Sequence, residues 1–85
     1  MVINYSDLKE IMYAGLADVA LELLKTGRKM TCDEVIAWIN KNFAFPEPYY
    51  SVRRVFQAAY VRTDDERQIA LTLVFTDKYG RPLLD

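Results

Sequence analysis

The segment from Thr31 to Arg62 constrains the fold most, because a capped helix, a proline-containing turn and a second helix follow one another there. The letters TCDE at residues 31–34 match a capping box, in which the Thr side chain caps the backbone of the Glu three residues later. Pro46 and Pro48 disfavour helical backbone in the residues before them and suit the first turn of a new helix. The sequence therefore predicts helices over residues 32–42 and 48–59.

A longer helix is predicted ahead of this segment. Ser6 is a good N-cap, Asp7 places negative charge in the first turn, and Gly27 is a C-terminal stop. Apolar residues recur between these ends at intervals of three and four, as in a helix with one face in the core: Leu8, Ile11, Met12, Gly15, Leu16, Val19 and Leu23. We expect this helix to cover residues 7–26, and Gly15 to let another backbone approach closely.

A second side of this first helix is also apolar, and it consists of Tyr13, Ala17, Ala20, Leu21 and Leu24. A helix that is apolar nearly all round is normally buried by something. Two interpretations are open. Either the C-terminal part of the chain covers this side, or the side forms the seam of a homodimer.

The C-terminal part of the chain has the period of a β-strand. Ile69, Leu71, Leu73 and Phe75 alternate with Ala70, Thr72, Val74 and Thr76, as expected of a half-buried strand. The acidic run from Asp64 to Glu66 would form the turn before it, and Pro82 would limit pairing of a short edge strand. The expected fold is α+β, a single domain over residues 1–85 in which three helices precede a hairpin with strands over 60–63, 68–76 and 81–84.

Composition limits the classes of protein to consider. A chain of 85 residues builds one core, and 52% apolar with 27% charged residues is ordinary for a soluble globular protein. No apolar run approaches the roughly 20 residues of a membrane span, and the N-terminus lacks the regions of a signal peptide. The lone Cys32 has no partner for an intramolecular disulfide. We therefore expect a cytoplasmic protein with no membrane association.

The residue types needed for common catalysis are scarce. With no histidine and one cysteine, the sequence lacks a usual general base, a thiol dyad and a tetrahedral zinc set. Its three glycines form no phosphate-cradling loop, and the acidic run lacks the spacing of a calcium loop. We expect no enzymatic activity, no cofactor and no metal site.

Positive charge gathers in the middle of the chain. Residues 28–62 carry six Lys or Arg against three acidic residues, although the net charge of the chain is −1. On the helix predicted over 48–59, one face carries Tyr50, Arg53, Arg54 and Gln57, opposite the apolar face. Arg offers a planar fork for phosphate or guanine, and Gln can pair with adenine, so this face suits a DNA major groove. An ordinary solvated helix surface is the alternative interpretation.

The order of elements resembles the winged helix-turn-helix superfamily. The resemblance rests on a long first helix, a link ending in KMT, the capped helix TCDEVIAWINKNF, the helix PYYSVRRVFQAAY and a hairpin. Many winged helices bind double-stranded DNA through their third helix, so the resemblance implies a DNA-binding transcriptional regulator. Because one recognition helix reads too few base pairs, we expect a homodimer, for which the first helix offers a seam. It places Tyr50, Arg53, Arg54 and Gln57 in the groove, and it places residues near the phosphates at the start of the second helix, namely Arg28, Lys29 and Thr31.

One feature departs from DNA-binding winged helices. The expected wing tip carries Asp64, Asp65 and Glu66, which the phosphate backbone would repel. Winged helices also serve as protein-interaction modules, and an isoelectric point near 5.4 with an acidic wing suits that use. An adaptor, or an inhibitor of a nucleic-acid enzyme, is therefore the second functional hypothesis, with the acidic wing or the second side of the first helix as its surface.

Overall fold

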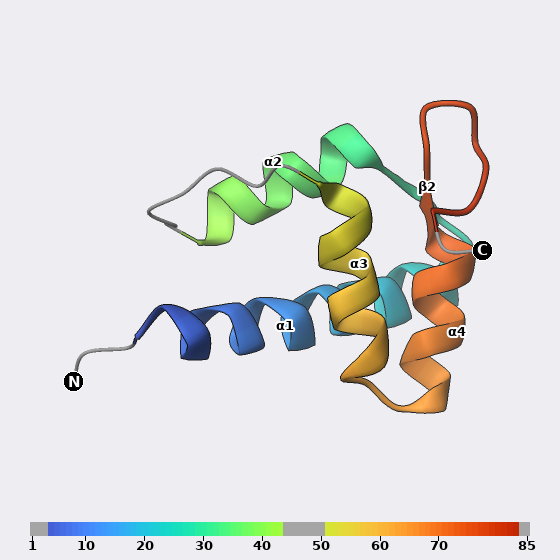
Figure 1. The fold of residues 1–85 in the computed structure, drawn as a ribbon. Helices are drawn as coiled ribbons and strands as arrows, with labels where there is room; N and C mark the ends of the chain where they lie inside the picture. Colours follow the sequence, from blue (N-terminus) through green and yellow to red (C-terminus); the bar gives the residue numbers. More distant parts are fainter. Residues whose placement is uncertain (1–3, 44–50, 84–85) are drawn as a thin grey trace.

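The computed structural model describes residues 4–43 and 51–83, which form four helices and two short strands (Figure 1). In chain order these are α1 Tyr5–Lys25, β1 Met30–Thr31, α2 Cys32–Asn42, α3 Val52–Val61, α4 Asp65–Val74 and β2 Phe75–Thr76. The helix α1 crosses behind α3 and α4, which stand side by side against it, and α2 lies above α1 (Figure 1). The described residues are therefore mostly helical, with a small two-stranded sheet.

The helix α1 begins two residues earlier than predicted. Its N-cap is Asn4, whose side-chain oxygen accepts a hydrogen bond from the Asp7 backbone N–H at 2.9 Å, so Ser6 lies inside the helix. At the other end Gly27 has a φ of 71°, and the backbone N–H of Arg28 donates to the Leu23 carbonyl at 3.0 Å. This is a Schellman motif, and it confirms Gly27 as the stop of the first helix.

The second apolar side of α1 is part of the core. Tyr13 is 9% exposed, Ala17 and Ala20 are fully buried, and Leu21 and Leu24 are partly buried against the same cluster. The α1 helix packs mainly on α4, so the C-terminal part of the chain covers this side, as one of the two interpretations expected. A homodimer seam on this side is therefore wrong, because these side chains are already occupied within the chain.

The predicted hairpin is wrong, because residues 65–74 form the helix α4. Asp64 caps this helix by accepting a hydrogen bond from the Arg67 backbone N–H at 3.0 Å, and acidic residues fill its first turn. Helical spacing buries Ala70, Leu71 and Val74, whereas Ile69 remains 56% exposed. The alternating pattern gave the wrong prediction because apolar residues stand at both odd and even positions of this segment. Such a pattern also fits a helical period.

Both strands are short and pair in parallel, with Met30 opposite Phe75 and Thr31 opposite Thr76. The edge strand expected over 81–84 is reduced to an antiparallel bridge between Thr76 and Pro82, and residue 84 lies outside the described residues. The antiparallel hairpin implied by the winged-helix resemblance is therefore not formed in the described part of the chain. The sheet instead ties the start of α2 to the end of α4.

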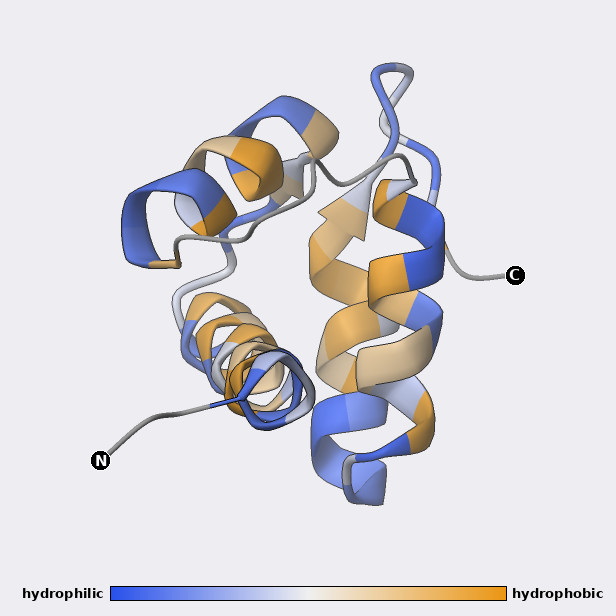
Figure 2. Cartoon of the chain, turned by 60° about the vertical axis from the view of Figure 1, so that its left-hand side comes forward, coloured by the Kyte–Doolittle hydropathy of each residue, from blue (hydrophilic) through white to orange (hydrophobic). Residues whose placement is uncertain are grey.

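The core joins residues that are far apart in the sequence. Phe56 of α3 and Phe75 of β2 are fully buried, and their rings stack with centroids 4.3 Å apart. Other fully buried side chains come from α1, α2 and α4: Met12, Leu16, Val35 and Leu71. Figure 2 shows hydrophobic residues where α1 faces the α3–α4 pair, and hydrophilic residues at the lower end of that pair.

The capping box holds the start of α2, and Gly15 is where α1 approaches this helix. The Glu34 backbone N–H donates to the Thr31 hydroxyl at 3.4 Å, and that hydroxyl lies 3.4 Å from the Glu34 carboxylate, so the predicted cap and helix over 32–42 are confirmed. Gly15 faces the ring of Trp38, whose nearest atom would lie 3.4 Å from an added Cβ. The close neighbour of Gly15 is thus a side chain of α2, where another backbone was expected.

Candidate nucleic-acid interface

The helix α3 is held by a cap and by a buried face. Ser51 is its N-cap, since the Ser51 hydroxyl accepts a hydrogen bond from the Arg54 backbone N–H at 3.2 Å. The helix therefore starts at residue 52, later than the start at 48 that the prolines suggested, and Pro46 and Pro48 lie outside the described residues. Its buried face consists of Val55, Phe56 and Ala59.

The opposite face of α3 carries the predicted recognition residues. Arg53, Arg54 and Gln57 are all exposed, as expected from the phase of the helix, and α3 contains no acidic residue. The guanidinium group of Arg54 forms no hydrogen bond or ion pair within the described residues. The fourth predicted member, Tyr50, lies outside the described residues. The structure thus brings three of the four together on one fixed helix face.

The residues expected near phosphates are in different situations. Arg28 and Lys29 are exposed in the link between α1 and β1, and their side chains form no ion pair within ranges 4–43 and 51–83. Thr31 is half-buried, pairs with Thr76 in the sheet and caps α2. The Thr31 hydroxyl is therefore committed to the fold, whereas Arg28 and Lys29 are available to a ligand.

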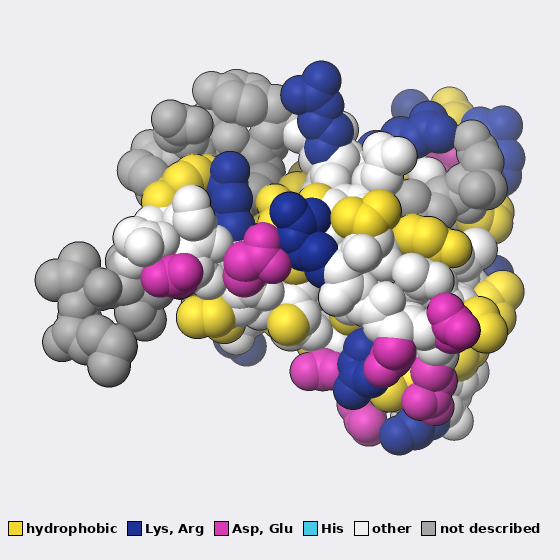
Figure 3. Space-filling model, turned by 60° about the horizontal axis from the view of Figure 1, so that its bottom comes forward, with side chains coloured by type: hydrophobic (Ala, Val, Ile, Leu, Met, Phe, Trp, Pro, Cys, Tyr) yellow, Lys and Arg dark blue, Asp and Glu magenta, His cyan; other side chains and the backbone are white. Residues whose placement is uncertain are grey.

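The acidic run is placed past the C-terminal end of α3, where it starts α4. Asp64 binds the Arg67 guanidinium at 2.6 Å, and the same guanidinium donates to Asp18 of α1 at 2.7 Å. Arg62 forms a similar link, donating to Glu10 at 2.8 Å. Both arginines therefore join the α3–α4 connection to α1. Figure 3 shows this mixture of acidic and basic side chains at the lower right.

The surroundings of Asp64 and of Cys32 displace the pKa values of these two groups. The hydrogen bond from the Arg67 backbone N–H lowers the pKa of Asp64, because it stabilises the charged carboxylate. Burial raises the pKa of the Cys32 thiol, and the carboxylates of Asp77 and Asp33 raise it further. The thiol donates to the Thr76 carbonyl at 3.5 Å. Cys32 is therefore protonated at neutral pH and is not an activated nucleophile.

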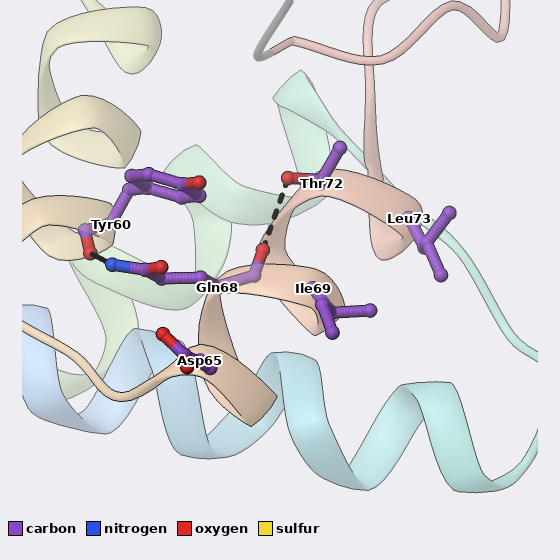
Figure 4. A pocket seen from close by; sticks show the side chains of 6 residues that line it. All are labelled: Tyr60, Asp65, Gln68, Ile69, Thr72 and Leu73. Atoms are coloured by element: carbon purple, nitrogen blue, oxygen red, sulfur yellow. Dashed lines mark hydrogen bonds between the residues drawn. The ribbon is translucent and has the colours of Figure 1, made fainter.

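A groove between α3 and α4 was missed by the sequence interpretation. It has a volume of about 460 Å³ and is lined by Tyr60, Asp65, Gln68, Ile69, Thr72 and Leu73 (Figure 4). The Gln68 side chain donates to the Tyr60 carbonyl at 3.0 Å and so links the two helices beside the groove. The four-residue spacing of Asp65, Ile69 and Leu73 was the signal that a helical interpretation of this segment would have used.

Comparison of the chain with protein-family models, with curated proteins and with solved structures found no match. In the described part of the chain, no three Cys, Asp or Glu side chains converge as metal ligands. None of the helices described combines the length and the apolar character needed to cross a lipid bilayer. The function must therefore be argued from the surfaces of the molecule.

Proposed function

We propose that this chain binds double-stranded DNA through the exposed face of α3 and acts as a transcriptional regulator. The observation that carries the proposal is the arrangement of Arg53, Arg54 and Gln57 on one rigid helix face that has no acidic neighbour within the helix. Arg and Gln are the side chains that pair most specifically with guanine and adenine in the major groove.

The distribution of charge along α3 supports DNA binding through its exposed face. Arg53 and Arg54 lie in the first turn, where the helix dipole adds partial positive charge that favours phosphate. The acidic residues follow the other end of α3, and its last residue, Val61, lies about 12 Å along the helix axis from Arg53 at about 1.5 Å per residue. The acidic run therefore lies beyond the end of α3 that is opposite the two arginines, which weakens the objection raised by an acidic wing.

The net charge of −1 predicts how such binding would behave. Long-range attraction to DNA is weak for this chain, so affinity depends on a few local contacts with phosphate and bases. Each phosphate contact contributes a slope of about −0.9 to the dependence of log K on log salt. We expect two to four phosphate contacts, and therefore a shallow slope of roughly −2 to −4 for log K against log salt.

Fluorescence anisotropy with pooled genomic duplexes, at low and at physiological salt, tests the proposal. The variant Arg53→Ala/Arg54→Ala should lose about tenfold or more in affinity, because it removes both guanidinium groups. Lys9→Ala/Lys25→Ala, on α1, is the matched control, since it removes the same net charge from elsewhere. Absence of binding at micromolar protein in low salt, or equal losses in both variants, would overturn the proposal.

The start of α4 favours a second candidate function, an adaptor or an inhibitor of a nucleic-acid enzyme. Asp65 and Glu66 are exposed, and their carboxylates form no ion pair with described residues. A pull-down from lysate should then yield one stoichiometric partner that Asp65→Lys/Glu66→Lys releases. Asp64 must stay unchanged in this test, because it caps α4. Retention of the partner by the reversed variant would contradict a role for the acidic surface.

A further inference from the structure

The outer face of α4 carries an apolar strip that the chain does not cover. Ile69 is 56% exposed and Leu73 is 52% exposed, and their four-residue spacing stacks them on one side of the helix. They form one wall of the α3–α4 groove, next to the half-buried Tyr60 (Figure 4). The opposite side of α4 packs on α1, so the helix is apolar on two sides and buried on one.

Charge is distributed unequally at the two ends of this strip. Asp65 and Glu66 lie at the N-terminal end of α4. The chain continues from the C-terminal end through β2 into the loop that carries Lys78 and Arg81 (Figure 1). Figure 3 shows acidic side chains together with basic ones at the lower right, mostly basic ones at the upper right and hydrophobic ones along the edge between. The basic residue in the first turn of α4, Arg67, is paired with Asp18 and Asp64. The strip is thus acidic at one end and basic at the other.

The basic end is partly neutralised within the loop. Arg81 forms an ion pair with Asp77 at 3.3 Å, and the Asp77 carboxylate also accepts the backbone N–H groups of Tyr79 and Arg81 at 2.8 and 2.9 Å. The Lys78 ammonium lies 5.0 Å from the centre of the Tyr79 ring. Asp77 is therefore occupied inside the loop. Lys78 also borders a hollow with Thr31, Cys32 and Asp33 at the start of α2, and its ammonium forms no ion pair with described residues.

We propose that a second copy of this chain covers the strip, with the two α4 helices packed antiparallel about a two-fold axis. A two-fold interface uses the same surface on both protomers, so that surface must complement itself when inverted. An axis between Ile69 and Leu73 places Ile69 of each protomer against Leu73 of its partner. The acidic end of each strip then meets the basic end of the other, whereas a parallel arrangement would bring like charges together.

The dimensions of the strip agree with this pairing. At about 1.5 Å per residue, Asp65 lies about 9 Å from the midpoint between Ile69 and Leu73. In the other direction, the rest of α4 and the two residues of β2 extend about 11 Å, and Lys78 follows them. Asp77 and Lys78 add up to about 7 Å more, so the side chain of Lys78 on one protomer extends back toward the Asp65 carboxylate on its partner.

Size-exclusion chromatography with light scattering, without DNA, tests the dimer separately from DNA binding. The wild-type chain should pass from monomer to dimer as its concentration rises into the micromolar range. Ile69→Glu/Leu73→Glu should be monomeric, because it sets like charges against each other across the axis. Ile11→Glu/Ile36→Glu is the matched control, since it changes two exposed isoleucines on α1 and α2 and should leave the dimer intact.

Ile69→Ala/Leu73→Ala guards against loss of folding, because Ala has the highest helix propensity and both side chains are more than half exposed. Its circular dichroism should match the wild type while its dimer dissociates at least about tenfold more readily. Asp65→Lys and Lys78→Glu should each weaken the dimer, and the double variant should restore it, because both ends are then exchanged. A wild-type chain that stays monomeric at several hundred micromolar, or a dimer unaffected by these changes, overturns the proposal.

Discussion

The helices α2 and α4 begin in the same way but differ in how they bury their residues. Each starts with an oxygen-bearing cap that accepts the backbone N–H three residues later, and each has two acidic residues in its first turn. Val35 and Ile39 form a single buried stripe on α2. The helix α4 buries Ala70, Leu71 and Val74, and it carries Ile69 and Leu73 on the side away from α1. A cap thus marks where each helix begins. The helical period of the sequence is easy to recognise only where, as in α2, the apolar residues form a single stripe.

The largest expected difference in stability is between Ala substitutions at two leucines of α4 that lie two residues apart. Leu71 is fully buried and Leu73 is 52% exposed, although a strand would place both on one face. Leu71→Ala should reduce the free energy of unfolding by about 2–5 kcal/mol, because it leaves a cavity in the core. Leu73→Ala should change it by no more than about 0.5 kcal/mol at concentrations where the chain is monomeric. Urea unfolding measures both, and equal losses would contradict the helix.

Removing the cap of α2 is expected to cause the second-largest loss of stability. Thr31→Ala removes the hydroxyl that accepts the Glu34 backbone N–H, and it should destabilise the chain by about 1 kcal/mol. Thr31→Ser keeps the hydroxyl and serves as the control, with most of the stability retained. Urea unfolding midpoints compare the two. A Thr31→Ala variant as stable as the wild type would mean that the 3.4 Å contact contributes nothing.

These differences explain what the sequence could reveal. Local sequence patterns were enough for a correct prediction where one pattern dominated. The capping box marked the start of α2, and helix phase predicted the exposure of Arg53, Arg54 and Gln57. It failed for residues 65–74, where apolar residues on two sides of α4 imitate the alternation of a strand. The partner that buries Tyr13 and Ala17 follows from tertiary packing, which no local pattern encodes.

The misinterpreted period and the proposed dimer surface have the same origin. Exposed Ile69 and Leu73 supplied the alternation that favoured a strand, and the same two side chains form the uncovered strip on α4. A surface residue of a monomeric helix would ordinarily be polar, and the period would then have been plain. The place where local reasoning failed is therefore also the place where the molecule presents an interaction surface, as functional sites often do.

Substitutions at Gly15 test the contact between α1 and Trp38 of α2, with a smaller expected change in stability. An added Cβ would lie 3.4 Å from the Trp38 ring, which is ordinary van der Waals contact, and Gly15 lies inside α1. Gly15→Ala should therefore stabilise the chain by up to about 1 kcal/mol through helix propensity. Gly15→Leu should destabilise it, because the larger side chain displaces Trp38 and with it α2. Thermal unfolding followed by circular dichroism measures both variants, and destabilisation by Ala would show that the ring cannot adjust.

The smallest expected effect concerns the charge on the α4 cap. Hydrogen bonding from the Arg67 backbone lowers the pKa of Asp64 below its ordinary value of 3.8. A carboxylate with a lowered pKa stabilises the folded state above its unfolded pKa, and this contribution is lost as the pH falls through the folded pKa. Asp64→Asn keeps a cap oxygen but no charge, so it should be less stable than the wild type near neutral pH, and the gap should close below about pH 4.

Thermal unfolding midpoints between pH 2 and 7 measure this gap, with Asp65→Asn as the control, because the Asp65 carboxylate forms no ion pair with described residues. The α2 cap is a neutral hydroxyl, so the Thr31→Ala deficit should stay nearly constant over the same range. The two helices, which begin alike at neutral pH, should therefore separate in acid, where α4 loses a contribution that the Thr31 hydroxyl of α2 never carried. A gap between Asp64→Asn and the wild type that persists to pH 2 would show that the amide is simply a poorer cap and that the carboxylate charge contributes nothing.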